Sequence, residues 1–221
     1  MKICIYPGGF DPFHKGHADV IVQAAAALQM GKEDKFIVVP DPRCKEGSNS
    51  SLEQRNRMID ITAAEIRKKI KSEIKVFNPY GHVTEDEISD ITASNSSYMK
   101  VAVPRIKEKY PDADFHMVMG ADRFLALKER GSGALRENIV VVTREGQSDI
   151  DEVTNAVADE TLVKKPVVIT GKFQDASATA VRQNISGNGG YDEIRDLISE
   201  NLYKFIINQG LYQNRIKEEK Q

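Results

Sequence analysis

Two histidines near the start of the chain, His14 and His17, are the side chains best suited to chemistry. They follow a glycine turn over residues 7–13 and are separated only by Lys15 and Gly16. Residues three apart on a helix share one face, so both imidazoles can reach one group beyond the helix N-terminus. The positive helix end and the imidazole donors favour an anion there. The pattern predicts a phosphate site in which negative charge develops during a reaction.

The glycines of this turn support the interpretation. Gly8 and Gly9 allow the backbone to approach a phosphate, and Gly16 leaves space for a flat ring or a ribose on the first helical turn. The turn is neither a G-x-G-x-x-G loop nor a P-loop. Metal ligation by the two histidines and a plain polar helix start remain alternatives, although no cysteine or carboxylate completes a compact metal site nearby.

The rest of the chain alternates apolar runs with helical patterns. Strands are expected over residues 2–6, 35–39, 74–77, 115–119, 139–143 and 167–170. Helices are expected over residues 17–30, 52–70 and 97–110, the last containing Pro104, which should kink or delay it. Such alternation predicts an α/β fold with an open, mainly parallel sheet. In these sheets ligands bind beyond the carboxyl ends of the strands, and the first strand-to-helix turn is the favoured phosphate site.

The C-terminal part, residues 177–209, is expected to be largely helical. Six apolar residues there make one stripe that predicts core packing: Ile194, Leu197, Ile198, Leu202, Phe205 and Ile206. The length of 221 residues fits a single domain over 1–221, with 177–212 as its helical C-terminal part.

Composition narrows the function further. Lys and Arg total 31 against 33 Asp and Glu, a net charge of −2, which argues against a general nucleic-acid binder. A hydrophobic share of 40% excludes disorder as the main state. The two cysteines, Cys4 and Cys44, form no metal-type pair, and no apolar stretch reaches the roughly 18 residues of a membrane span. We therefore expect a cytoplasmic protein without a membrane or nucleic-acid partner.

Two motifs resemble the nucleotidylyltransferase superfamily. The stretch from His14 to His17, after Gly-Gly-Phe-Asp-Pro, resembles its (H/T)xGH signature, and residues 176–182, Ala-Ser-Ala-Thr-Ala-Val-Arg, resemble its ISSTxxR signature. Members of this superfamily have a Rossmann-like fold with helices on both faces of the sheet. They transfer a nucleotide monophosphate from a triphosphate and release pyrophosphate.

The chain is most similar to the nicotinate-mononucleotide adenylyltransferase branch. The similarity covers nearly the entire chain and includes Lys45 with residues 55–58, residues 97–98, 110–113, 119–122, 141–146 and 203–212. Four positions depart from the branch pattern: Gly9 for Thr or Ser, Cys44 for His, Met99 for Thr and Arg130 for Trp. The chain has no Trp at all, so the pyridine ring of the acceptor would need another contact, such as Phe124 or Tyr80.

The resemblance implies direct in-line attack of the acceptor phosphate on the α-phosphorus of ATP bound to Mg²⁺, without a covalent enzyme intermediate. It assigns His14 and His17 to the triphosphate and its developing charge, and Lys45 and Arg182 to the departing phosphates. The other residues assigned to ATP are Gly8, Gly9, Phe10, Gly16, Ser177 and Thr179, the last two as caps of the late helix. Those assigned to the acceptor or a ribose are Tyr98, Gly120, Asp122 and Arg144. Asp122 as a plain helix N-cap is the alternative.

The acceptor itself stays open between nicotinate and nicotinamide mononucleotide, and Arg123 or Arg130 could supply charge to a nicotinate carboxylate. Pantetheine-phosphate adenylyltransferase is the nearest rival, because that branch begins YPGTFDP. Two further alternatives are a nucleotide-binding regulatory protein that has lost turnover and a metal hydrolase that uses the histidine pair. Association into a homo-oligomer is a further possibility.

Overall fold

The computed structural model describes residues 1–43, 50–76, 99–131, 135, 137–144, 149–159, 162–172 and 177–213. The first half of the described chain runs β1 (Lys2–Gly8), α1 (Lys15–Ala27), β2 (Lys35–Pro40), α2 (Leu52–Ile66), β3 (Glu73–Val76), α4 (Met99–Lys109) and β4 (Asp114–Gly120). The second half runs α5 (Ala121–Glu129), β5 (Asn138–Arg144), α6 (Asp149–Ala158), β6 (Val167–Gly171), α7 (Ala178–Ser186), α8 (Tyr191–Ile194) and α9 (Glu200–Asn208).

The six strands form one sheet in the order β3-β2-β1-β4-β5-β6, and every neighbouring pair is parallel. The predicted α/β, Rossmann-like parallel sheet is confirmed. The strand order reverses between β1 and β4: the chain first builds outward to β3 and then returns to build outward to β6. At such a point the connections diverge and leave a crevice at the carboxyl ends of the strands, where ligands bind in this fold class.

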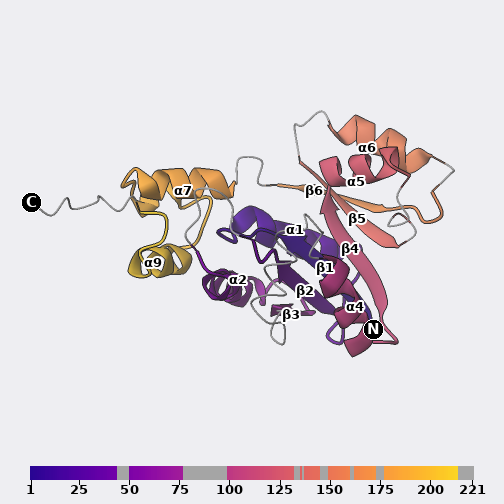
Figure 1. Cartoon of the computed structure of the whole chain (residues 1–221), viewed down its shortest axis with the longest axis horizontal. Helices are drawn as coiled ribbons and strands as arrows, with labels where there is room; N and C mark the ends of the chain where they lie inside the picture. Colours follow the sequence, from indigo (N-terminus) through magenta and orange to yellow (C-terminus); the bar gives the residue numbers. More distant parts are fainter. Residues whose placement is uncertain are drawn as a thin grey trace, which may run out of the picture.

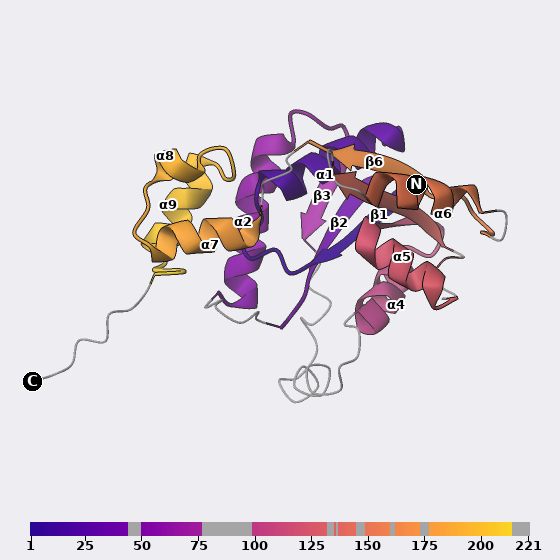
Figure 2. The same cartoon turned by 90° about the horizontal axis from the view of Figure 1, so that it is seen from above.

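Helices cover both faces of the sheet. Cys4 and Tyr6 of β1 pack on the side of α1 and α2, where Ile21 belongs to the same buried cluster. Ile3 and Ile5 point to the other face and pack with Ile106 of α4. Figure 2 shows α1 on the opposite side of the sheet from α4 and α5. Because β1 is buried on both faces, its sequence is a continuous apolar run and not an alternating one.

The C-terminal helices form a separate cluster at one end of the molecule, beyond α2 (Figure 1). Ile198, Leu202 and Ile206 are 0–1% exposed and pack with Met58 of α2. The single stripe expected from Ile194 to Ile206 is therefore divided: Ile194 belongs to α8, whereas Leu202 and Ile206 belong to α9. Ser199 breaks the run, because its hydroxyl caps α9 by accepting a hydrogen bond from the Leu202 N–H at 3.3 Å.

Several helix boundaries differ from the expectation. Helix α1 begins at Lys15, two residues before the expected start, because the extended backbone of His14 makes that residue the N-cap. It ends at Ala27 and α2 ends at Ile66, both earlier than expected. Pro104 lies inside α4, whose described part begins at Met99. Among the helices described, none is long and apolar enough to span a bilayer.

Asp34, directly before β2, accepts hydrogen bonds from the first residues of β1 and β3. Its carboxylate oxygens accept hydrogen bonds from the backbone N–H of Lys2 at 2.6 Å and of Gly31 at 2.8 Å. Its carbonyl accepts from the Glu73 N–H at 3.0 Å. Partial burial raises the pKa of the Asp34 carboxyl, but the bonds from Gly31 and Lys2 and the charge of Lys2 outweigh it, so the pKa lies below its usual value.

We expect Asp34→Ala to lower the free energy of unfolding at pH 7 by about 1–2 kcal/mol, because two backbone donors lose a charged acceptor. The folded pKa lies below the unfolded value, so this stabilisation is complete above the unfolded pKa of about 3.9 and disappears as the pH falls through the folded value. Urea unfolding at neutral and acidic pH measures the gap between variant and wild type. The gap should close in acid, and a gap that stays constant contradicts the assignment. Glu33→Ala, at the exposed neighbouring position, serves as the control and should change stability by less than about 0.5 kcal/mol.

Candidate active site

A cavity of about 260 Å³ lies at the carboxyl ends of the strands, where the strand order reverses. It is lined from β1 and the first turn by Tyr6, Pro7, Gly8 and Phe10, from α1 by His14, Gly16, His17 and Val20, and from β4, β5 and β6 by Gly120, Val142 and Gly171. Six of the residues assigned from the sequence meet in this cavity: Gly8, Phe10, His14, Gly16, His17 and Gly120.

His17 is held in one orientation and one neutral tautomer. Its Nδ1 accepts a hydrogen bond from the backbone N–H of His14 at 3.2 Å. A ring nitrogen that accepts carries no proton, so the neutral ring carries its proton on Nε2. Aromatic contacts fix the ring plane, because the centroids of Phe10 and Phe13 lie 5.0 and 5.2 Å from that of His17. His17 is therefore a preoriented hydrogen-bond donor at the cavity wall.

His14 completes the pair. Its ring stacks on that of His17 with centroids 3.7 Å apart and an interplanar angle of 26°, and the residue is only 6% exposed. The two imidazoles thus face the same cavity, as the three-residue spacing predicts. Two cationic rings at this separation would repel each other, so an anion in the cavity would stabilise any positive charge that the pair acquires.

Phe10 and Gly8 shape the turn together. Phe10 adopts a positive φ of 51°, which is unfavourable for an aromatic residue, and its side chain is 3% exposed. A Cβ at position 8 would lie 2.7 Å from the Phe10 ring. The glycine at position 8 is therefore required by the ring of Phe10, in addition to any approach of phosphate that the sequence suggested.

Gly120 has a different reason to be glycine. It is the N-cap of α5 with ordinary extended backbone, and a Cβ built there meets no atom of the described residues within 4 Å. Since Gly120 lines the cavity, a side chain would enter the space that a ligand would fill.

Helix α7 brings Arg182 against the first turn. One terminal nitrogen of Arg182 donates to the carbonyl of Asp11 at 2.6 Å, and the other donates to the Thr179 hydroxyl at 3.3 Å. Ser177 is the N-cap of α7 and accepts from the Ala180 N–H at 3.0 Å, as predicted. Thr179 lies within the first helical turn of α7 and does not cap that helix. Of these three residues Arg182 contacts the turn over residues 7–13, and none of the three is among the residues that line the cavity.

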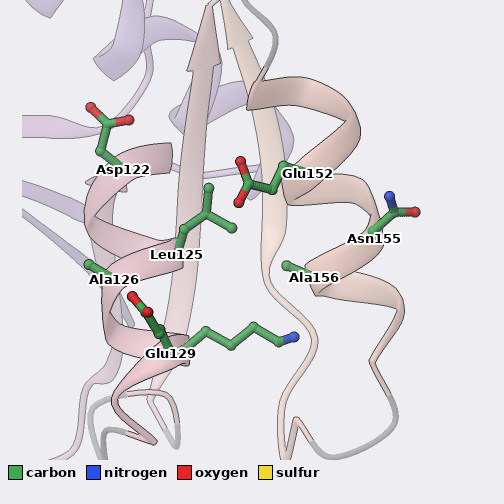
Figure 3. Close-up of a pocket in the computed structure, with 8 residues that line it drawn as sticks. Asp122, Leu125, Ala126, Glu129, Glu152, Asn155 and Ala156 are labelled. Carbon is green, nitrogen blue, oxygen red and sulfur yellow. The ribbon is translucent and has the colours of Figure 1, made fainter.

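Two interpretations of α5 are wrong: Asp122 as the N-cap of the helix and Phe124 as a stacking partner of the acceptor ring. The assignment of Asp122 to the acceptor or a ribose stays a prediction. Asp122 is not the N-cap, which is Gly120, and it lines a groove of about 750 Å³ between α5 and α6 instead of the histidine cavity (Figure 3). Phe124 is fully buried with Ile139 and Val141, so it cannot stack on a substrate ring. Its side chain points into the sheet because it lies two residues beyond Asp122 on the helix, on the opposite side.

The structure leaves other assignments as predictions. Cys44, Lys45, Tyr80 and Tyr98 lie outside the described residues. The backbone of Arg144 ends β5 beside Gly171, and its side chain lies outside the described part. Met99, where the branch has Thr, is half-buried and packs against the cluster of α4 and β1. Arg130 is the exposed C-cap of α5.

Sequence reasoning gave no structural role to Lys15, Asp11, Arg55 or Tyr212. Lys15 binds the C-terminal segment, with its N–H on the Leu197 carbonyl at 2.8 Å and its Nζ on the Arg195 carbonyl at 2.5 Å. Arg55 is 1% exposed. A charged residue among apolar residues at helical spacing, between Leu52 and Ile59, was the available signal for Arg55. Asp11 and Tyr212 are joined across 201 positions, and no local pattern indicates such a contact.

Comparisons with known proteins identify the family of the chain. A family model described as cytidylyltransferase-like matches residues 5–184. The chain is 24% identical to a probable nicotinate-nucleotide adenylyltransferase of Clostridium tetani, over 96% of this chain and 98% of that one. It is 25% identical to a protein with the same description from Neisseria meningitidis serogroup B, with the same coverage.

Solved structures support the fold. Two structures of the Plasmodium falciparum nicotinic acid mononucleotide adenylyltransferase, one complexed with APC and one with NaAD, each give a TM-score of 0.65 at 18% identity. Each comparison covers 96% of this chain and at least 96% of the other. Since the family model spans both the histidine turn and Arg182, the chain belongs to the cytidylyltransferase-like family.

Proposed function

We propose that the protein is an adenylyltransferase that moves AMP from ATP to nicotinate mononucleotide, or to its amide counterpart, and releases pyrophosphate in NAD synthesis. The observation that carries the proposal is the preoriented His17 beside His14 in the cavity at the reversal of the sheet. The descriptions of the Clostridium and Neisseria relatives, which match nearly the whole chain, support the choice of reaction.

The proposed reaction is a single displacement. An oxygen of the acceptor phosphate forms a bond to the α-phosphorus of ATP while the bond from that phosphorus to pyrophosphate breaks. The Nε2–H of His17 donates to a phosphate oxygen, and the N-terminus of α1 and the His14 ring add to the stabilisation of developing charge. Arg182, already beside the first turn, takes the departing phosphates together with Lys45 and the start of α7.

Magnesium enters this scheme with the nucleotide. Among the described residues no group of three or more His, Cys, Asp or Glu could hold a metal ion on its own. Mg²⁺ in nucleotide enzymes keeps several waters and binds mainly to the substrate phosphates, so such a group is not required. Bound there, the ion would neutralise phosphate charge. The side chains of the cavity would orient the triphosphate.

The acceptor ring is the open part of the specificity. Phe124 is excluded as its stacking partner by burial, whereas Arg123 and Arg130 are exposed on α5 and are candidates to face a nicotinate carboxylate. We further propose one nucleotidylyltransferase domain over 1–221, acting in the cytoplasm where ATP is available. We propose no nucleic-acid or membrane partner, and we propose self-association as a property to be tested by sedimentation.

An acceptor panel tests the reaction. With ATP and Mg²⁺, we expect pyrophosphate release with nicotinate or nicotinamide mononucleotide and none with pantetheine phosphate. Release only with pantetheine phosphate would assign the rival reaction. ATP binding by calorimetry without release with any acceptor would instead indicate a nucleotide-binding regulatory protein.

His17→Ala should lower kcat/KM by about 10²–10³-fold, because one preorganised donor to the developing charge is lost. His116→Ala is the matched control: His116 pairs with Asp114 at 3.1 Å in the amino-terminal half of β4, away from the cavity. The control should stay within about twofold of wild type. Equal activity of wild type and His17→Ala would refute the assignment of His17, and stoichiometric zinc in the purified protein would favour metal hydrolysis.

Gly120→Ala tests whether the cavity binds substrate. The added methyl meets no atom in the part of the chain that the structure describes, so we expect the free energy of unfolding to fall by less than about 1 kcal/mol, the cost of alanine at an N-cap. Because the methyl enters the cavity, we expect the KM of a substrate to rise about tenfold, near the loss that 1.4 kcal/mol produces. Gly190→Ala is the matched control, since Gly190 is also an N-cap whose Cβ would meet no described residue within 4 Å, but it is not among the residues that line the cavity. Equal kinetics in both variants would show that the cavity is not the substrate site.

A further inference from the structure

A buried carboxylate lies at the base of the first turn. Asp11 is 4% exposed, between the glycines of the turn and His14. Its Oδ1 accepts hydrogen bonds from the Ser50 hydroxyl at 2.6 Å and from the hydroxyl of Tyr212. Its backbone carbonyl accepts from Arg182. One residue of the turn thus receives donors from the segment before α2, from α7 and from the C-terminal end of the described chain.

The C-terminal turn brings the Tyr212 hydroxyl to the Asp11 carboxylate. After α9 the chain passes through Gly210 at φ 60° and reaches Tyr212 at φ 61°. A left-handed conformation is unfavourable for tyrosine and persists only where the surroundings hold it. Here Leu211 and Tyr212 are 2% and 5% exposed, and the Tyr212 hydroxyl also lies 3.7 Å from the Met58 sulfur. The backbone strain is therefore held by contacts at both Leu211 and the Tyr212 side chain.

Tyr212 remains a donor across the neutral pH range. Burial, and then the charge and hydrogen bond of Asp11, raise the pKa of the Tyr212 hydroxyl far above its usual value. The phenol therefore stays protonated and its hydrogen points to the carboxylate. This matters because a carboxylate buried without donors is strongly destabilised, and the turn that carries it would shift.

The network of hydrogen bonds that Asp11 accepts from Ser50, Tyr212 and Arg182 lies beside the proposed nucleotide site. Asp11 lies three residues before His14, and its carbonyl is the acceptor that orients the guanidinium of Arg182. A displacement of Asp11 would move both the histidine turn and the acceptor of Arg182. The acceptor mononucleotide has no assigned contact with the network. The effect of breaking it should therefore fall on the triphosphate.

We propose that Tyr212 is a positioning residue for nucleotide binding, whose hydroxyl holds Asp11 so that the histidine turn and Arg182 face the triphosphate together. The inference rests on the proposed function for the identity of the nucleotide. Tyr212 does not line the cavity, so it acts through Asp11 and not by touching substrate.

Tyr212→Phe is the direct test, because it removes only the hydroxyl. We expect the dissociation constant of ATP with Mg²⁺, measured by calorimetry without acceptor, to rise about tenfold, and the KM of the mononucleotide to stay within twofold. Tyr203→Phe is the matched control: Tyr203 lies in α9, packs on Tyr191 with ring centroids 5.5 Å apart, and has no contact with Asp11. Unchanged ATP affinity in a folded Tyr212→Phe protein overturns the proposal.

A double-mutant cycle separates positioning from plain stabilisation. If Tyr212 acts by way of Asp11 on Arg182, the loss of ATP affinity in Tyr212→Phe should be largely absent when Arg182→Ala is already present. Equal losses in both backgrounds contradict the coupling. Should Tyr212→Phe fail to fold, Asp11→Asn keeps the side-chain volume and weakens the acceptor, and ATP affinity should again fall while the KM of the mononucleotide stays within twofold.

The two proposals fail in different ways. A wild-type protein that binds ATP but releases no pyrophosphate with any acceptor refutes the adenylyl transfer and leaves the Tyr212 test intact. An active wild type whose Tyr212→Phe variant binds ATP normally refutes the positioning role alone.

Discussion

A buried guanidinium beneath the first turn is the interaction on which the site depends. The terminal nitrogens of Arg55 donate to four backbone carbonyls, those of Gly9, Asp41, Pro42 and Arg43. Arg55 forms no ion pair with any described residue, so carbonyl dipoles balance its charge. A buried cation without such partners would cost several kcal/mol. The residues that follow β1 and β2 must therefore both lie beside the Arg55 guanidinium. This requirement fixes where the turn toward His14 begins.

Fixed dipoles and a few placed donors can replace bulk positive charge at such a site. The chain has a net charge of −2, and its histidine cavity is walled by glycines, aromatic rings and one preoriented imidazole. Two cations that the structure describes beside the turn are constrained: Arg55 is buried and donates to backbone carbonyls, and Arg182 donates to the Asp11 carbonyl. Donors held in place lose little entropy when a phosphate arrives. A site of this kind gains its selectivity from geometry more than from long-range attraction.

The parts that the sequence predicted well are those governed by local patterns. The six strands follow from apolar runs, four of which end at glycine or proline, and the histidine pair follows from its spacing after a glycine turn. The stacking role of Phe124 was wrong because a helix turns about 100° per residue, and the face that packs on the sheet is decided by tertiary contacts. Arg55 and Tyr212 were missed for a related reason, since their acceptors lie in segments remote in sequence and only the folded chain brings them together.

The contact of Tyr212 with Asp11 joins positions 201 residues apart, so the last described turn of the chain contributes a hydrogen bond to the turn before His14. The two clusters that cover the faces of β1 contain no residue of α7, α8 or α9. The C-terminal helices instead pack on α2 through Met58, which also contacts Tyr212. A contact between segments far apart in sequence carries a loop-closure cost that contacts formed before it must offset. The sheet can therefore form before the Tyr212 hydroxyl reaches Asp11. The C-terminal helices, packed on α2, therefore carry the residue whose hydroxyl bonds Asp11 in the turn at the opposite end of the sequence.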